Sequence, residues 1–376
     1  MAPAVELLAE VVVHRDPASY CAHPHLVRCR GELLCLFTCG PRRPFVLHPP
    51  EDPAFTNLLA RSADEGASWS APVPVPGPDW TGVECGSLTA LPDGGLLLHQ
   101  HRFDWLDLAA AEARPERAAI AWPEDLVRAH LASAEHEPEG LGLERARALL
   151  PWARAPGRAF LHRSADGGRS WPTTVPLDTA PYEGGYGLRG GVVLADGTVL
   201  LPLADCPAYR RVFALHSTDG GWSWSRPVAV AAAPDRWFEE PAPLLLTDGR
   251  VLLLLRENAS RTLWRVESAD GGRSWSKPEP TAIDGYPAHL CRLPDGRILC
   301  TYGFRRPPFA IRAVLSQDDG RSWRTGTPLE VAGGLGSKDL GYPCTLPRED
   351  GTLLTVFYAR DREGVTFPRA RIWRLR

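Results

Sequence analysis

Short apolar runs, each broken by a tight polar turn, recur at six places along the chain. They are "LVRCRGELLCLF", "LTALPDGGLLLH", "GVVLADGTVLLPL", "PLLLTDGRVLLLL", "LCRLPDGRILCTY" and "CTLPREDGTLLTVFY". Asp-Gly between apolar runs is a strong hairpin signal, because the turn needs positive φ angles that glycine adopts at little cost. The pattern therefore predicts six β-hairpins.

A second pattern, S-x-D-x-G-x-x-W, occurs five times between these hairpins. Its copies begin at Ser62, Ser164, Ser217, Ser268 and Ser316, so the successive steps are 102, 53, 51 and 48 residues. A period near 50 residues is the size of one four-stranded blade. Together the hairpins and the period predict an all-β, six-bladed β-propeller that forms a single domain over residues 1–376. We expect a strand near the N-terminus to pair with strands near the C-terminus and close the ring, since closure removes exposed strand edges.

The residue types of the repeated box suit a structural role. Its serine and aspartate can bond to backbone amides of a turn, its glycine permits a left-handed conformation, and its tryptophan supplies a large apolar surface. We expect each box to fasten the hairpin between two outer strands of a blade, and none to take part in catalysis.

The first step of 102 residues is too long for one blade. Residues 104–157 are rich in Ala, Arg, Glu and Leu, which favour helix, with Pro and Gly as breaks. This segment is predicted to be an insert of two or three short helices in the second blade, over one end of the propeller. An alternative role for it is a contact between subunits in an oligomer.

Composition excludes several classes of partner and cofactor. The formal net charge of −3 gives no basic field for nucleic acid or anionic membranes. The chain has no basic segment followed by an apolar leader and no run of about 18 apolar residues, so we expect a soluble, cytoplasmic protein. The nine cysteines lack paired C-x-x-C spacing and are expected to be mostly buried thiols. No calcium-loop motif is present, and we expect neither metal nor cofactor.

Polar and aromatic residues gather just upstream of each hairpin, where the strand itself needs none. Counting nine residues back from each turn glycine gives Ala22, Cys85, Leu188, Glu240, Pro287 and Tyr342. In a propeller these positions line the central cavity. We therefore expect substrate contacts from this band, including Glu84, Tyr286 and His289.

The boxes and hairpins resemble those of the sialidase (neuraminidase) superfamily over nearly the whole chain except the helical insert. That resemblance implies a tyrosine nucleophile activated by a glutamate, an aspartate as acid/base, and three arginines that bind the substrate carboxylate. Tyr342 and Glu240 match the tyrosine and the glutamate, and Arg256 and Arg306 match the second and third arginines. Sequence does not separate Arg306 from Arg305.

One position in the first blade departs from the pattern of the family. Ala22 stands where the first arginine is expected, and His23, His25 and Arg189 are the candidates to replace it. The loss of one bidentate arginine contact puts sialic acid itself in question as the substrate.

The acid/base aspartate should lie before the first box. Asp52 is the nearest carboxylate to the expected position, and Glu51 and His48 are the alternatives.

Three functions fit these residues. The first is a retaining exo-glycosidase of the sialidase type that acts on a terminal acidic sugar, either sialic acid or another. The second is a polysaccharide lyase, or another uronate-active enzyme on the same propeller, in which Tyr342 and His23 or His25 act as acid and base on a uronate. The third is a propeller that binds glycans without chemistry, because one fold hosts many functions.

Overall fold

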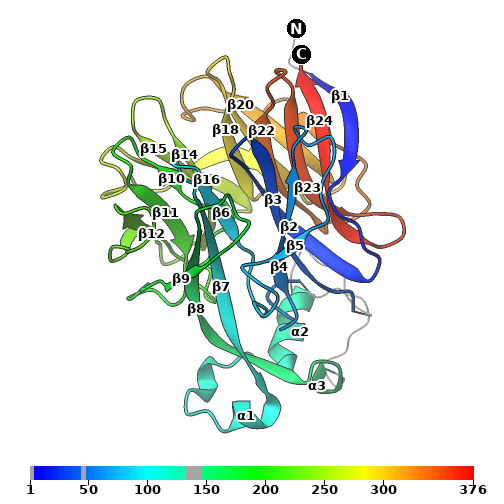
Figure 1. Ribbon diagram of the computed structural model, residues 1–376, viewed down its shortest axis with the longest axis vertical. Helices are drawn as coiled ribbons and strands as arrows, with labels where there is room; N and C mark the ends of the chain where they lie inside the picture. The colour runs from blue at the N-terminus through cyan, green and yellow to red at the C-terminus, as the bar shows by residue number, and fades with distance from the viewer. Residues whose placement is uncertain (1–3, 44–47, 133–145) are drawn as a thin grey trace.

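The computed structural model of the chain describes residues 4–43, 48–132 and 146–376. Its strands form six four-stranded antiparallel sheets, which surround a common centre as the blades of a propeller (Figure 1). The innermost strands of neighbouring blades contact one another around that centre. The predicted fold class, a six-bladed propeller with a small helical insertion in the second blade, is confirmed.

The blades are numbered along the chain, and the strands of each blade are given from the innermost to the outermost. Blade 1 contains β2 (Ser19–Cys29), β3 (Glu32–Pro41), β4 (Thr56–Ser62) and β5 (Val73–Val75). Blade 2 contains β6 (Ser87–Ala90), β7 (Leu96–Asp107), β8 (Trp152–Ser164) and β9 (Thr173–Pro176). Blade 3 contains β10 (Val192–Val193), β11 (Val199–Ala204), β12 (Val212–Ser217) and β13 (Val228–Ala231).

The other three blades follow the same plan. Blade 4 contains β14 (Phe238–Leu245), β15 (Val251–Glu257), β16 (Thr262–Ser268) and β17 (Glu279–Asp284). Blade 5 contains β18 (Ala288–Arg292), β19 (Ile298–Phe304), β20 (Ala310–Ser316) and β21 (Leu329–Ala332). Blade 6 contains β22 (Leu340–Pro347), β23 (Leu353–Arg360), β24 (Thr366–Leu375) and β1 (Val5–Val12).

The ring is closed by the two ends of the chain. Strand β1 pairs antiparallel with β24, from Val5 opposite Leu375 to Val12 opposite Arg369. The two termini consequently lie side by side (Figure 1). The predicted closure is confirmed, and it brings the first and last strands of the chain into one blade.

The five boxes follow the third strand of blades 1 to 5. In the first box the Gly66 N–H donates to the Ser62 hydroxyl (2.8 Å), and the Ser68 N–H donates to the Asp64 carboxylate (2.9 Å). Hydrogen bonds from Ser68 lead the causes that lower the pKa of Asp64 to about 2. The equivalent bonds recur in the other four boxes. The boxes thus fasten turns, as expected from their residue types.

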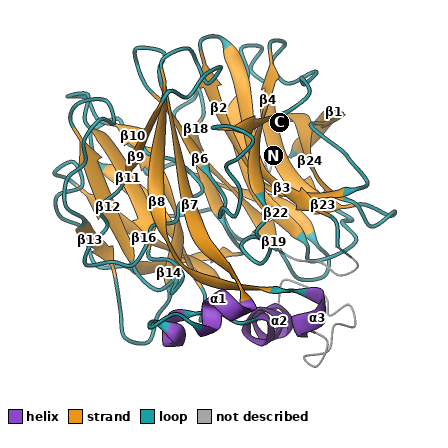
Figure 2. Ribbon diagram, turned by 60° about the horizontal axis from the view of Figure 1, so that its bottom comes forward, coloured by secondary structure: helices purple, strands orange, loops and turns teal. Residues whose placement is uncertain are grey.

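The insert is carried by an extension of the β7–β8 hairpin beyond the ring. Its helices are α1 (Leu108–Glu112), a 3₁₀ turn (Arg117–Ala119), α2 (Pro123–Ala132) and α3 (Ala146–Leu149), and they gather at one end of the molecule (Figure 2). Residues 133–145 of the predicted insert lie outside the described residues. Where the structure describes the chain, no helix is long and apolar enough to cross a membrane.

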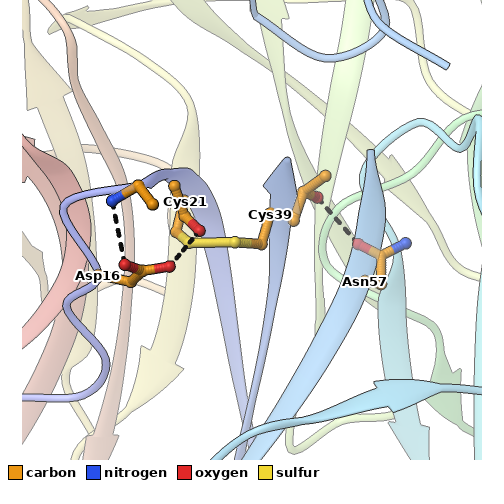
Figure 3. The surroundings of a disulfide bond; sticks show 7 residues. Asp16, Cys21, Cys39 and Asn57 are labelled. Atoms are coloured by element: carbon orange, nitrogen blue, oxygen red, sulfur yellow. Dashed lines mark hydrogen bonds between the residues drawn. A yellow bond between two sulfur atoms is a disulfide. The ribbon is translucent and has the colours of Figure 1, made fainter. Parts of the chain in front are cut away.

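One pair of cysteines forms a disulfide that the sequence did not predict. Cys21 on β2 and Cys39 on β3 are register partners in blade 1, and the bond joins the two strands (Figure 3). Nearby, Asp16 accepts from the Ser19 hydroxyl at the start of β2 (2.5 Å). The remaining seven cysteines are free and buried, in agreement with the expectation for most of the set.

Candidate functional site

Three innermost strands share an unusual local structure at one end of the ring. His23 on β2, Glu240 on β14 and Tyr342 on β22 each precede a proline and each have positive φ, at 55°, 50° and 49°. At all three places the strand register shifts, which marks a β-bulge. Positive φ is costly for residues other than glycine, and strain of this kind tends to cluster at functional sites. The three side chains belong to one buried cluster.

The centre of the cluster is a direct bond between Tyr342 and Glu240. The Tyr342 hydroxyl donates to Oε1 of Glu240 at 2.5 Å, and both residues are buried. The Tyr186 hydroxyl donates to the same oxygen at 3.4 Å. A phenol with a carboxylate at this distance has a base positioned to take its proton.

Arg256 lies on the other side of Glu240. Its Nη1 is 3.3 Å from each carboxylate oxygen of Glu240, and its Nε is 3.3 Å from Glu239. The guanidinium also stacks over the Tyr286 ring, with 4.1 Å between the guanidinium carbon and the ring centroid. These contacts compensate a guanidinium that is largely removed from water. They also fix its orientation toward the tyrosine–glutamate pair.

The second arginine of the cluster is Arg305. The sequence-based match of Arg306 to the third arginine of the family is therefore corrected to Arg305. The Arg305 guanidinium lies 5.3 Å from the Tyr342 ring and 5.7 Å from the Tyr286 ring. The side chain of Arg306, by contrast, is 52% exposed and forms an ion pair with Asp284. The two arginines follow one another just beyond β19, and of the two it is Arg305 whose guanidinium lies by the Tyr342 ring.

His23 occupies the place in blade 1 where the family arginine was sought. Its Nε2 lies 2.8 Å from Nε2 of His48, so one ring nitrogen donates and the other accepts. The His23 ring packs edge-on against Tyr342, with 4.1 Å between ring centroids. Ala22, to which the count of nine residues led, is fully buried. A pair of histidines therefore lies beside the tyrosine in place of an arginine.

Three of the predicted substrate contacts lie at interfaces between blades: His25, His289 and Arg189. His25 Nδ1 accepts from the Leu88 N–H (3.0 Å) in blade 2. His289 Nδ1 accepts from the Thr345 N–H (3.3 Å) in blade 6. Burial, followed by the nearby Arg189, lowers the pKa of His25 to about 3 and that of His289 well below its usual range. Both rings are therefore neutral at neutral pH, and their bonds hold neighbouring blades together.

Arg189 is likewise bound to the scaffold. Its Nε donates to the Ala288 carbonyl (2.8 Å), and its Nη1 lies 3.5 Å from the Pro24 carbonyl. These bonds link blade 3 to blades 5 and 1. The expectation that His25, His289 and Arg189 contact substrate is therefore replaced by a role in joining blades.

A second tyrosine–glutamate pair lies in blades 2 and 3. The Tyr209 hydroxyl donates to Glu84 at 2.7 Å, and burial raises the pKa of the Glu84 carboxyl. Tyr209 packs edge-on against Tyr186, which itself bonds to Glu240. The two pairs are thus joined through aromatic rings. Tyr186 and Tyr209 were not predicted from the sequence, although Tyr186 lies two residues before Leu188, one of the positions of the inner band.

The loop before β4 supplies the remaining candidates. Asp52 accepts from Arg43 Nε (2.7 Å) and from the Ala54 N–H (2.9 Å). Its carboxylate therefore bonds to residues close to it in the sequence. Glu51 accepts from the His48 N–H (2.8 Å), and burial is the main cause that raises its pKa to about 7. His48 contacts His23, which packs against Tyr342, and Glu51 bonds to His48. Glu51 and His48 are therefore better candidates than Asp52 for the acid/base group.

The insert packs against the same loop. Trp152 Nε1 donates to the Glu51 carbonyl (3.2 Å), and Arg154 Nη1 donates to the Pro50 carbonyl (2.8 Å). The helical insert is therefore at the same end of the ring as Tyr342, in agreement with the prediction that it lies over one end of the propeller.

The raised pKa of Glu51 predicts a pH-dependent effect of Glu51→Gln on stability. The folded pKa of about 7 exceeds the ordinary value of 4.5, so the folded state holds a proton that the unfolded state releases between these values. The wild type should lose stability as pH rises through this range. Glutamine does not titrate and can still accept from the His48 N–H, so the variant should gain stability relative to the wild type between about pH 5 and about pH 8.

Urea denaturation at the two pH values measures this change. Glu349→Gln, at an exposed glutamate, is the matched control and should show a constant difference. A difference for Glu51→Gln that is the same at both pH values would contradict the prediction.

No group of three or more His, Cys, Asp or Glu side chains within the described ranges is arranged to hold a metal ion.

The fold and the boxes define a sialidase-like Asp-box propeller. Residues 151–355, more than half of the chain, match the family model described as a BNR repeat-like domain, and the chain belongs to this family. A comparison with curated proteins found no match.

Several known structures share the fold. A protein of unknown function from Dyadobacter fermentans has a TM-score of 0.78 and 23% identity, covering 99% of this chain and 100% of that one. A mutant of NanB sialidase from Streptococcus pneumoniae has a TM-score of 0.67 and 14% identity, covering 97% of this chain and 70% of that one. The intramolecular trans-sialidase from Ruminococcus gnavus has a TM-score of 0.65 and 14% identity, covering 99% and 96%. At these identities the likeness establishes the fold alone.

Proposed function

We propose that the protein is a retaining exo-glycosidase that releases a terminal acidic sugar from a glycan. The observation that carries this proposal is the 2.5 Å hydrogen bond from the Tyr342 hydroxyl to Glu240. A free phenol, with a pKa near 10, is a weak nucleophile at neutral pH, and a carboxylate at this distance can remove its proton as the bond to carbon forms. Tyrosine nucleophiles are known exceptions to the two-carboxylate scheme of glycosidases.

In the first step the Tyr342 oxygen attacks the anomeric carbon while Glu240 takes the phenolic proton. The bond to the leaving oxygen breaks, and a group on the Glu51–His48 loop donates a proton to it. In the second step water attacks the same carbon, the loop group takes a proton from that water, and Glu240 returns its proton to the tyrosine oxygen. Two displacements at one carbon retain the configuration of the sugar.

The arginines support an acidic substrate. Arg256 and Arg305 both lie over the Tyr286 ring, beside the tyrosine–glutamate pair. Guanidinium groups bind carboxylates through paired N–H donors, so a carboxylated sugar is the substrate class that suits them. The His23–His48 pair offers fewer donors than an arginine would, which favours an acidic sugar other than sialic acid.

A second candidate is a lyase that acts on a uronate. The observation that favours it is the His23–His48 pair, which lies edge-on against Tyr342. A histidine could remove the proton next to the carboxylate, Tyr342 could protonate the leaving oxygen, and the arginines could neutralise the carboxylate. The products would be a reducing end and an unsaturated uronate.

A product assay on a panel of sialylated and uronate-terminated oligosaccharides separates the candidates. Under the proposed function, one acidic sugar is released with a new reducing end, and no product absorbs in the ultraviolet as an unsaturated uronate does. An ultraviolet-absorbing product would support the lyase. Binding without any product would support a non-catalytic glycan-binding propeller.

A further inference from the structure

A hollow of about 610 Å³ lies on blade 2, at the base of the insert. Three aromatic side chains line it, and so do three charged ones: Phe103, Trp105, Phe160, Arg102, Asp104 and Arg158. None of the site residues described above lines this hollow. Its volume is in the range of small-ligand pockets, which combine aromatic walls with a few polar groups.

The backbone around the hollow is shaped by a bulge and two glycines. The β7–β8 register shifts between Arg102 and Asp104, opposite Gly157. A Cβ on Gly157 would lie 1.8 Å from the Arg102 carbonyl oxygen, so only glycine lets the two strands approach there. A Cβ on Gly82 would lie 2.5 Å from the Trp105 ring, and Trp105 Nε1 donates to the Gly82 carbonyl (3.1 Å). The Trp105 ring is therefore held against bare backbone as one wall.

The charges of the hollow are unbalanced. Arg102 on β7 and Arg158 on β8 are direct register partners, and like charges that face each other across two strands destabilise the pair. Arg102 donates to the Thr81 carbonyl (3.0 Å) and lies over the Trp80 ring. Among the residues that the structure describes, neither guanidinium has a carboxylate within ion-pairing distance. Asp104, the carboxylate of the lining, lies 3.5 Å from Arg114.

We propose that this hollow is a second, non-catalytic binding site for a carboxylated sugar. The carboxylate would lie between the Arg102 and Arg158 guanidinium groups and relieve their repulsion, and the sugar ring would lie against Trp105. Backbone groups along the bulge would bond to the hydroxyls. A site of this kind would hold one residue of a glycan while another is at Tyr342, which raises the effective concentration of the chain end.

Isothermal titration calorimetry with free D-glucuronate, N-acetylneuraminate, D-glucose and acetate tests the site without any turnover. Arg158→Glu reverses a charge on an exposed side chain, so the fold should be kept. Arg226→Glu, at an exposed arginine after the third box, is the matched control because Arg226 does not line the hollow.

The wild type and Arg226→Glu should bind at least one of the acidic sugars equally, and Arg158→Glu should bind it at least tenfold more weakly or lose one binding event. D-glucose and acetate should bind weakly to all three proteins. Unchanged binding in Arg158→Glu, no binding of either acidic sugar to the wild type, or acetate binding as tightly as the sugars would overturn the proposal. Because the measurement is of binding alone, failure of the glycosidase mechanism would leave it unaffected.

Discussion

Tyr342→Phe should lower kcat/KM on an acidic glycan by several orders of magnitude and leave the fold intact. The substitution removes the hydroxyl that donates to Glu240 at 2.5 Å and keeps the ring that packs against His23. If the phenolic oxygen forms the covalent bond, its loss removes an interaction made only in the transition state, so kcat falls and substrate binding changes little. Release of sugar under single-turnover conditions measures this directly.

The same variant also has a defined cost in stability. The lost hydroxyl bonds a buried carboxylate, and hydrogen bonds to charged groups contribute about 2 kcal/mol. Glu240 keeps its contacts with Arg256 and Tyr186, so the loss should not exceed this figure. Tyr182→Phe is the matched control, since that ring stacks on Phe213 away from the cluster (4.4 Å between ring centroids). Full activity in Tyr342→Phe, or an equal loss of activity in Tyr182→Phe, would refute the assignment of the nucleophile.

The propeller could be predicted because its signals are local. Each Asp-Gly turn and each box lies within a stretch of about a dozen residues, and the number of repeats fixes the number of blades. The Tyr342–Glu240 contact could also be predicted from the sequence, because equivalent positions of the inner strands converge on one centre. Their separation of 102 residues in the sequence does not matter once the repeat is known.

The register of the first blade could not be predicted by counting. The first hairpin turns at two residues, Arg30 and Gly31, both with positive φ. In blades 4 and 6 three residues lie in the turn, inside the backbone bonds from Leu246 to Arg250 and from Arg348 to Thr352. The count of nine therefore ended on Ala22, one residue before His23. The better signal was the proline that follows His23, Glu240 and Tyr342, because proline inside a strand marks a bulge.

Two other features depend on loops, where sequence patterns say least. Arg305 and Arg306 are consecutive residues after β19. The direction of the chain there decides which of the two side chains faces the cluster, and the sequence has no periodicity at this point that predicts that direction. His48 contacts His23 from the segment before β4, and that segment also contacts the insert through the bond from Trp152 to the Glu51 carbonyl. Residues that are positioned by such long-range contacts can be identified only from the folded structure.

Glu240→Gln should lower kcat by about 10²–10⁴-fold, the usual contribution of a positioned general base. Glutamine keeps the shape of the side chain and can still accept from the Tyr342 hydroxyl, but it cannot take the proton. Arg256 would lose one of its two carboxylate partners and keep Glu239, at 3.3 Å from its Nε. We therefore expect some loss of stability, measured by denaturation alongside activity.

The double variant Tyr342→Phe/Glu240→Gln gives the sharper result. If the two residues act as one nucleophile, removing both should cost no more activity than Tyr342→Phe alone, because the base has no function once the hydroxyl is gone. The control cycle pairs Tyr342→Phe with Tyr209→Phe, whose hydroxyl bonds Glu84 in the other tyrosine–glutamate pair. Activity losses that simply multiply in the Tyr342–Glu240 cycle would show that the two groups act independently, and Glu240 would then be an anchor for Arg256 with no part in activating the tyrosine.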